Sequence, residues 1–163
     1  MKVPSILFFL CATTVPCLTA CATTSLTVAP VGPGVASRSV ASSSGYLKVF
    51  TATHQVDVDF EAYFHPHASY RVEDVSGRTV KFVANHSSDQ DEAPDVAGLP
   101  PGRYNVIAES TWYGMVTVPV VIEKGKTTVV QLDGHWRGGA HNDALVHLPD
   151  GETIGWSVSA PRP

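Results

Sequence analysis

The chain has 163 residues and a formal net charge of −4, with 11 basic and 15 acidic side chains. Because it is acidic overall and shows no basic patch, we expect no nucleic-acid partner. Its three cysteines all fall within the first 21 residues, so the rest of the chain is expected to fold without a disulfide.

The first 20 residues have the features of a secretory signal peptide. One positive charge, Lys2, precedes an apolar run from Ile6 to Ala12, and small residues follow the run. The run is too short for a membrane-spanning helix, which needs about 20 mostly apolar residues. We therefore expect residues 1–20 to direct export and then to be removed.

The end of this segment, Leu18-Thr19-Ala20-Cys21, resembles the lipobox of bacterial lipoproteins. The resemblance implies that the chain is cut before Cys21 and that this cysteine carries acyl chains, palmitate among them. Several acyl chains anchor a protein firmly to a membrane, where one chain would bind reversibly. Ala22 rather than Asp follows the cysteine. By resemblance to the sorting rule of many Gram-negative lipoproteins, this implies the outer membrane of the cell envelope, with the protein facing the periplasm.

Residues 21–45 are interpreted as the lipidated cysteine followed by a flexible linker. They are almost all Ala, Ser, Thr, Val, Pro and Gly, with a single charge, a composition typical of a tether. The remainder, residues 46–163, has the size of one domain. Within it, residues 134–163 are expected to add a loop and a C-terminal hairpin.

Short β-type runs separated by turn signals occupy this domain. The pattern predicts an all-β fold, namely an antiparallel β-sandwich of about seven to eight strands, Ig-like or transthyretin-like. Pro119 falls inside one run and predicts an edge strand or a bulge there. The predicted strands are residues 46–53, 70–75, 78–84, 93–99, 103–110, 115–123, 127–133, 144–149 and 153–159.

Alternation along these runs predicts which side chains face the core. On one predicted strand, for example, Tyr104, Val106 and Ala108 share a face. The residues predicted to point inward are Val72, Phe82, Leu99, Tyr104, Val106, Val118, Ile122, Val130 and Leu132.

Residues 96–133 resemble the carboxypeptidase regulatory-like or prealbumin-like domains. These domains carry a Leu-x-Pro-Gly-x-Tyr turn, two strands, a Gly-containing turn and a closing strand. The resemblance implies a transthyretin-like sandwich with a structural or adhesive role and without catalytic residues. We expect Gly102 to adopt a positive φ and Tyr104 to be buried at the sandwich end. The matching positions are Leu99, Pro101, Gly102, Tyr104, Gly125, Thr127, Thr128, Val129 and Leu132.

The motifs of the common enzyme classes are missing from the sequence. There is no Gly-x-Ser-x-Gly nucleophile motif, no Gly-rich phosphate loop and no cysteine after Cys21. We therefore expect a protein that is not an enzyme and that needs no cofactor.

Two segments could hold a metal ion. Asp57, Asp59 and Glu61 alternate along the chain, so in an extended segment their carboxylates would share a face suited to Ca²⁺. The simpler interpretation is a solvated strand face that discourages edge pairing. His65 and His67 flank a proline and could share Zn²⁺ or Cu²⁺ with a further ligand, His54 or His86. Scattered surface histidines are again the simpler interpretation.

Exposed aromatic residues are the candidates for contact with a partner. Trp112 and Tyr113 are expected at a hairpin apex, and Trp136 is expected to open a flexible loop that runs through Asn142. Such residues can contact a protein or a glycan, or they can fold back over the end of the sandwich.

Taken together, the sequence predicts a non-enzymatic envelope lipoprotein. Its β-sandwich would have a structural or binding role, in contact with another protein, peptidoglycan or polysaccharide. The alternative is a metal-binding envelope protein that uses His65, His67 and nearby acids.

Overall fold

A computed structural model of the chain describes residues 28–34, 39–57, 62–139 and 144–158. The twelve elements within these ranges are all β-strands, which confirms the all-β class. None of the described residues belongs to an apolar helix of membrane-spanning length.

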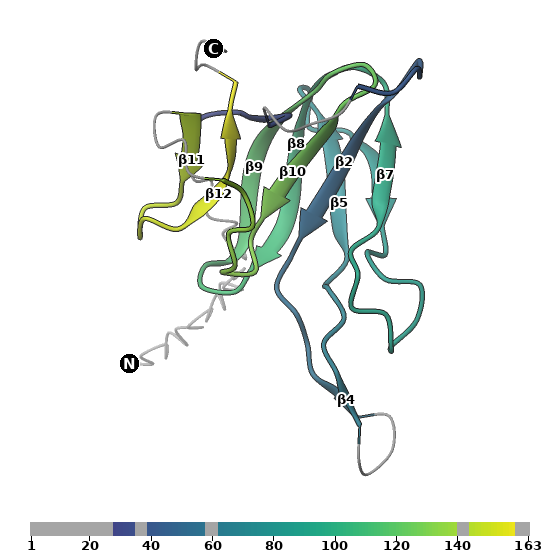
Figure 1. Ribbon diagram of the computed structural model, residues 1–163, viewed down its shortest axis with the longest axis vertical. Helices are drawn as coiled ribbons and strands as arrows, with labels where there is room; N and C mark the ends of the chain where they lie inside the picture. Colours follow the sequence, from purple (N-terminus) through teal and green to yellow (C-terminus); the bar gives the residue numbers. More distant parts are fainter. Residues whose placement is uncertain (1–27, 35–38, 58–61, 140–143, 159–163) are drawn as a thin grey trace, which may run out of the picture.

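Seven strands form the larger of two main sheets, which we call the large sheet (Figure 1). Neighbouring strands in it are antiparallel except for the β1–β9 pair, which is parallel. In spatial order the strands are β11 (Leu145–His147), β12 (Thr153–Ser157), β1 (Val31–Gly32), β9 (Gly114–Ile122), β8 (Gly102–Ser110), β5 (Tyr70–Asp74) and β6 (Thr79–Val83).

The small sheet has three strands, in the order β10 (Thr127–Gln131), β2 (Gly45–Phe50) and β7 (Val96–Leu99). β2 pairs with β7 in the antiparallel sense but with β10 in the parallel sense. A further short pair, β3 (Val56–Asp57) and β4 (Tyr63–Phe64), projects from one end of the domain (Figure 1).

The expectation of a purely antiparallel fold of seven or eight strands is therefore wrong. The turn at Lys124-Gly125 follows β9 in the large sheet and leads to β10 in the small sheet. Because the chain changes sheets at this turn, β9 and β10 do not form a hairpin, and β10 pairs with β2 instead. β1, β3 and β4, strands of two residues each, add to the nine runs predicted from the sequence and bring the number of described strands to twelve.

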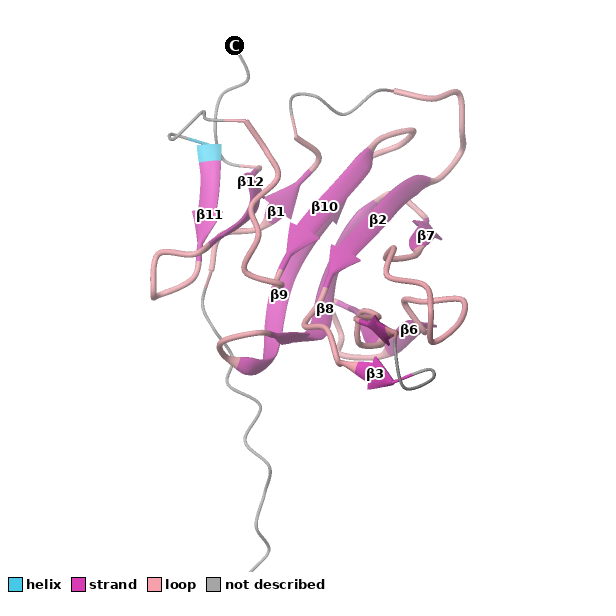
Figure 2. Cartoon of the chain, turned by 60° about the horizontal axis from the view of Figure 1, so that its bottom comes forward, coloured by secondary structure: helices cyan, strands magenta, loops and turns pink. Residues whose placement is uncertain are grey.

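The two sheets lie over one another, with β10 and β2 in front of β9 and β8 in Figure 2. Alternate residues of each sheet meet in one core, for example Leu47 and Val49 of β2 and Val116 and Val118 of β9. Of the nine residues predicted to point inward, seven are buried: Val72, Leu99, Val106, Val118, Ile122, Val130 and Leu132.

The other two inward predictions need correction. Tyr104 is only half-buried, although it packs against the core. Phe82 is 68% exposed. In the register of β6 against β5, Phe82 lies opposite the exposed Arg71, whereas Val83 lies opposite the buried Tyr70. The inward face of β6 is therefore the one that carries Val83, opposite to the face predicted.

Part of the predicted linker forms a strand of the large sheet. Val31 is fully buried and lies between Ser157 of β12 and Val120 of β9. Among the described residues, β1 covers β9 only at this one position. β9 nevertheless lies inside the sheet, between β8 and β1, and its register against β8 is unbroken at Pro119, so Pro119 marks neither the edge strand nor the bulge that was expected.

The hairpin between β5 and β6 turns at Ser76-Gly77, as predicted, and Gly77 has a φ of 83°. The carboxylate of Asp74 accepts hydrogen bonds from the backbone N–H groups of Ser76 at 2.9 Å and Arg78 at 3.1 Å. Hydrogen bonds from the Ser76 hydroxyl and from these N–H groups lower the pKa of Asp74 to about 2. Asp74 thus holds the turn in its ionised form.

The predicted turn at Gly102 differs from expectation. Gly102 does not have a positive φ and is the first residue of β8. The turn is stabilised by the side chain of Tyr104 instead, whose hydroxyl donates to the carbonyl oxygen of Pro100 at 3.0 Å.

Candidate functional site

Several of the predicted site residues lie outside the described residues. These include the signal peptide and the lipidation site Cys21, two of the three alternating acids, Asp59 and Glu61, and Asn142 of the predicted loop. The third acid, Asp57, is exposed, and its carboxylate accepts a hydrogen bond from the side chain of Gln55 at 3.3 Å.

The structure does not bring His65 and His67 together as a metal site. His65 is exposed, and its backbone N–H donates to the carboxylate of Glu92 at 2.7 Å, with the ring Nδ1 3.5 Å from the same oxygen. His67 is buried, and its Nδ1 lies 2.7 Å from the carbonyl oxygen of Thr51. No group of three His, Cys, Asp or Glu side chains among the described residues is placed to hold a metal ion.

The two further histidines considered as ligands also have other partners. His54 lies 3.3 Å from the carboxylate of Glu109, and the Nδ1 of His86 lies 3.0 Å from the carbonyl oxygen of His67. These contacts join the base of the β3–β4 projection to the main body of the domain. Within the described residues, the histidines therefore have structural contacts rather than a shared ligand.

Asn85 stabilises the base of the β3–β4 projection. The sequence analysis did not identify this residue. Asn85 is fully buried and has a φ of 69°, a conformation that Asn tolerates better than most residues. Its side-chain amide lies 3.0 Å from Val49 O, 3.1 Å from Thr51 Oγ1 and 3.2 Å from Ala68 O. One side chain thus connects β2, the segment after it and the segment before β5.

The β8–β9 turn places one aromatic side chain in solvent and folds the next one back. Trp112 is 70% exposed, and its indole lies beside Gly134, in the segment after β10. Tyr113 is half-buried and packs against the core. Of the two residues predicted at this apex, Trp112 is therefore the one available to a partner.

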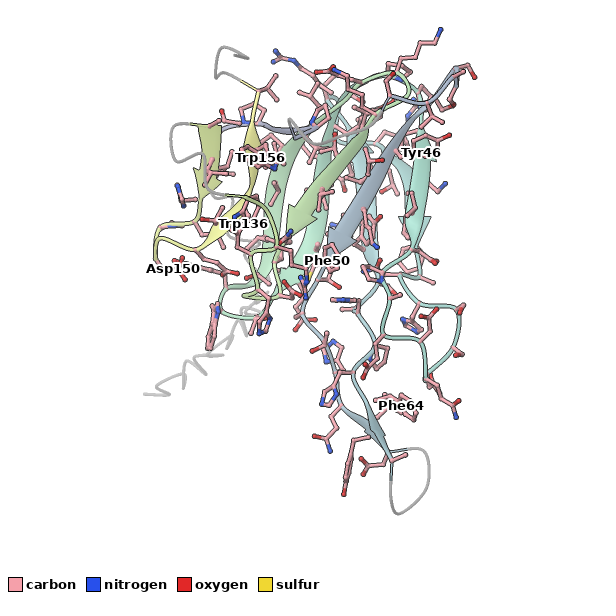
Figure 3. The ribbon with its side chains drawn as sticks, in the orientation of Figure 1. Tyr46, Phe50, Phe64, Trp136, Asp150 and Trp156 are labelled. Carbon is pink, nitrogen blue, oxygen red and sulfur yellow. The ribbon has the colours of Figure 1, made fainter. Side chains whose placement is uncertain are left out.

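Trp136 is half-buried and packs against Trp156 of β12, with the ring centroids 5.7 Å apart and the planes inclined at 59° (Figure 3). The backbone of Gly138 lies against the Trp136 indole. The backbone N–H of Arg137 donates to the side chain of Gln131 at 2.7 Å. These contacts hold residues 136–138 on the domain, contrary to the flexible loop expected there.

The outer face of the small sheet carries a column of aromatic and basic side chains. On β2, Tyr46, Lys48 and Phe50 alternate with the buried Leu47 and Val49. Figure 3 shows Tyr46 and Phe50 along this strand, and Trp136 near Trp156. We call the surface formed by Tyr46, Lys48, Phe50 and Arg137 the aromatic–basic face. The alternation of Tyr, Lys and Phe along the predicted strand was the signal that could have identified it.

Phe50 is the centre of this face. The Arg137 guanidinium carbon lies 4.3 Å from the Phe50 ring centroid, and Lys48 Nζ lies 5.1 Å from it. Both distances are within the range of a cation–π interaction. His67 meets the same ring edge-on, with the centroids 5.6 Å apart.

The two cations differ in their partners. Arg137 donates to the carboxylate of Asp133 at 2.8 Å, so its charge is largely compensated. Lys48 has no carboxylate or hydrogen-bond partner among the described residues, and its contact is with the Phe50 ring. The ammonium of Lys48 is therefore available to an anionic group.

An open hollow of about 470 Å³ adjoins the other end of the column. It is lined by residues 39–43 and Lys124. The Tyr46 hydroxyl reaches this segment, where it donates to the hydroxyl of Ser42 at 3.3 Å. Ser42 therefore lines the hollow and also contacts Tyr46 of the aromatic–basic face.

Comparison of the chain with protein-family models, with curated proteins and with solved structures finds no match.

Proposed function

We propose that this chain is a non-enzymatic envelope lipoprotein whose β domain binds a partner outside the cytoplasm. The observation that supports a binding role is the exposure of aromatic and basic side chains on the domain, above all Trp112, which is 70% exposed. Large aromatic side chains contribute strongly to binding when a partner covers them.

The proposed anchor is Cys21, on the resemblance of Leu18-Thr19-Ala20-Cys21 to a lipobox. In this proposal the protein is held to the outer membrane by its acyl chains and faces the periplasm. The described domain would then contact another envelope protein, peptidoglycan or a polysaccharide.

The proposed fold family is the carboxypeptidase regulatory-like or prealbumin-like group, with a transthyretin-like sandwich. Two packed sheets and the Leu99–Tyr104 turn, closed by the Tyr104 hydroxyl on Pro100 at 3.0 Å, support it. The parallel β2–β10 pair and the short additional strands are departures from the expected pattern.

Replacement of the anchor residue tests the localisation. In cells fed a radiolabelled palmitate, the parent protein is expected to incorporate label and to sediment with membranes. Cys21→Ala should incorporate none and should become soluble in the envelope or retain its signal. Cys17→Ala, four residues upstream, is the matched control and should behave as the parent. Equal labelling of Cys21→Ala and the parent would rule out this anchor.

The binding role is tested with the parent protein and a Trp112→Ala variant. Co-sedimentation with purified peptidoglycan, pull-down with envelope polysaccharide, and crosslinking in intact cells cover the three classes of partner. Phe82→Ala removes a similarly exposed aromatic side chain, 68% exposed, from the distant strand β6 and serves as the control. If Trp112→Ala still bound the partner and Phe82→Ala did not, the contact would lie at β6 and not at the β8–β9 turn.

A further inference from the structure

The aromatic–basic face has a chemistry that the exposed Trp112 does not share. It combines flat aromatic rings with two cations on the outer surface of the small sheet. We propose that this face binds a polysaccharide that carries carboxylate groups. The inference rests on the proposed binding function and names the class of ligand and the surface that holds it.

The shape of the face suits an extended chain. Tyr46 and Phe50 lie four residues apart on one strand, so they are separated by about 13 Å along the sheet. Tyr46 lies opposite Gly98 on β7, and a Cβ at Gly98 would meet nothing within 4 Å. The flank of the Tyr46 ring toward β7 is therefore open, so a sugar ring can lie against it through its apolar C–H face.

The charges on the face suit carboxylates. Lys48 and Arg137 are both held over the ring of Phe50, at 5.1 and 4.3 Å from its centroid. A chain with acidic groups on successive sugars can therefore contact both cations at once. Lys48 has three N–H donors and no acid partner among the described residues, and Arg137 has donors beyond those directed at Asp133 and His135.

The same face is a poor match for a nucleic acid. Aromatic and basic side chains also bind single strands, but that binding needs several phosphate contacts. Here two cations lie on a chain with a net charge of −4, and one of them is already paired with Asp133. A carboxylated polysaccharide, which can place its sugar rings on Tyr46 and needs only these two cations, is the better match.

The test uses the detergent-solubilised full chain in affinity electrophoresis through gels that contain polygalacturonate, neutral dextran or single-stranded DNA. We expect retardation by polygalacturonate, and little by dextran or DNA. Lys48→Gln should weaken binding to polygalacturonate at least fivefold, and Tyr46→Ala at least tenfold. Arg103→Gln, which removes one exposed positive charge from β8 of the large sheet, is the matched control and should bind as the parent does.

Three results would overturn the inference. Equal retardation by dextran and polygalacturonate would show that the carboxylate groups do not contribute to binding. Tighter binding to DNA would identify a different ligand. Loss of binding in Trp112→Ala with Lys48→Gln and Tyr46→Ala unaffected would move the site to the β8–β9 turn, and the proposed binding function would survive. Should Tyr46→Ala fail to fold, Lys48→Gln decides alone, because it changes a partly exposed side chain.

Discussion

The guanidinium of Arg137 lies 2.8 Å from the carboxylate of Asp133, and the Asp133 side chain is only 6% exposed. The acid is thus shielded from water and depends on this cation for its charge balance. Removal of one member of such a pair costs more than the pair contributes, because the other charge is left without a partner.

Arg137→Ala is therefore expected to lower the free energy of unfolding by about 2 kcal/mol, since the shielded carboxylate of Asp133 then keeps only the backbone N–H of His135, at 3.2 Å, and the His135 ring, at 4.0 Å. Urea denaturation measures the change. Arg78→Ala is the control, because Arg78 is 79% exposed in its pair with Asp74 and such pairs contribute about 1 kcal/mol or less. Equal losses in the two variants would show that Asp133 is not dependent on Arg137.

Tyr70 presents the opposite situation, a buried polar atom without a partner. Its side chain is 2% exposed, and its hydroxyl makes no hydrogen bond with any described residue. Burial, and after it the nearby Asp95 carboxylate, raises the pKa of the Tyr70 hydroxyl well above its ordinary value. Because an unsatisfied buried hydroxyl is costly, Tyr70→Phe is expected to raise the free energy of unfolding by about 1 kcal/mol. A loss of stability on urea denaturation would reveal a hydrogen bond that the described residues do not contain.

Gly125 and Gly102 are expected to respond differently to alanine. Gly125 has a φ of 70°, and a Cβ there would lie 2.2 Å from the carbonyl oxygen of Val40. The left-handed conformation alone costs a residue with a Cβ about 1–2 kcal/mol, so Gly125→Ala should be clearly destabilising.

Gly102 lacks a positive φ. A Cβ added at Gly102 would have the Tyr104 ring as its nearest neighbour, at 3.5 Å, which is an ordinary van der Waals contact. Gly102→Ala should therefore change stability by no more than about 1 kcal/mol. Thermal unfolding of both variants measures the contrast. If Gly102→Ala proved the more damaging, the turn would need the positive φ that the sequence predicted.

The features that could be predicted from the sequence are those set by local pattern. The alternation in β8 and β9 and the turn at Ser76-Gly77 are local signals, and the structure has these elements where they were expected. The strand pair β2–β10 is parallel because of a change of sheet at Lys124-Gly125, which no local pattern encodes.

Other features depend on neighbours that the sequence does not identify. β1 has two residues, too few for alternation, and is a strand only because β9 and β12 flank it. Phe82 alternates correctly with Val83, but period alone does not say which of the two faces the small sheet. The aromatic–basic face is formed when Arg137, remote in sequence, lies over Phe50.

Glu152 is expected to make the free energy of unfolding depend on pH. Both of its carboxylate oxygens are shielded from solvent, and neither accepts a full hydrogen bond from a described residue. Burial raises the pKa of Glu152, and the carboxylates of Asp150 and Asp133 raise it further, while the Gly134 N–H and His135 oppose the shift in part.

A raised pKa in the folded state means that folding favours the protonated form. The stability that this provides is fully present below the ordinary pKa near 4.5 and is lost as pH rises through the raised, folded-state value. Glu152→Gln mimics the protonated acid at every pH. It should therefore match the parent in acid and become the more stable of the two as pH rises.

The comparison variant is Asp91→Asn, because the shift of Asp91 has the opposite sign. Hydrogen bonds from the Ser87 hydroxyl, and then from the backbone N–H groups of Ser87 and Ala93, lower the pKa of Asp91. Its stabilising effect is present above the ordinary pKa and is lost as pH falls, so Asp91→Asn should lose stability relative to the parent as pH rises. Urea denaturation from pH 3 to pH 8 gives both differences. If the Glu152→Gln difference were flat across this range, its carboxylate would be solvated and the shielding of its oxygens would have no effect on stability.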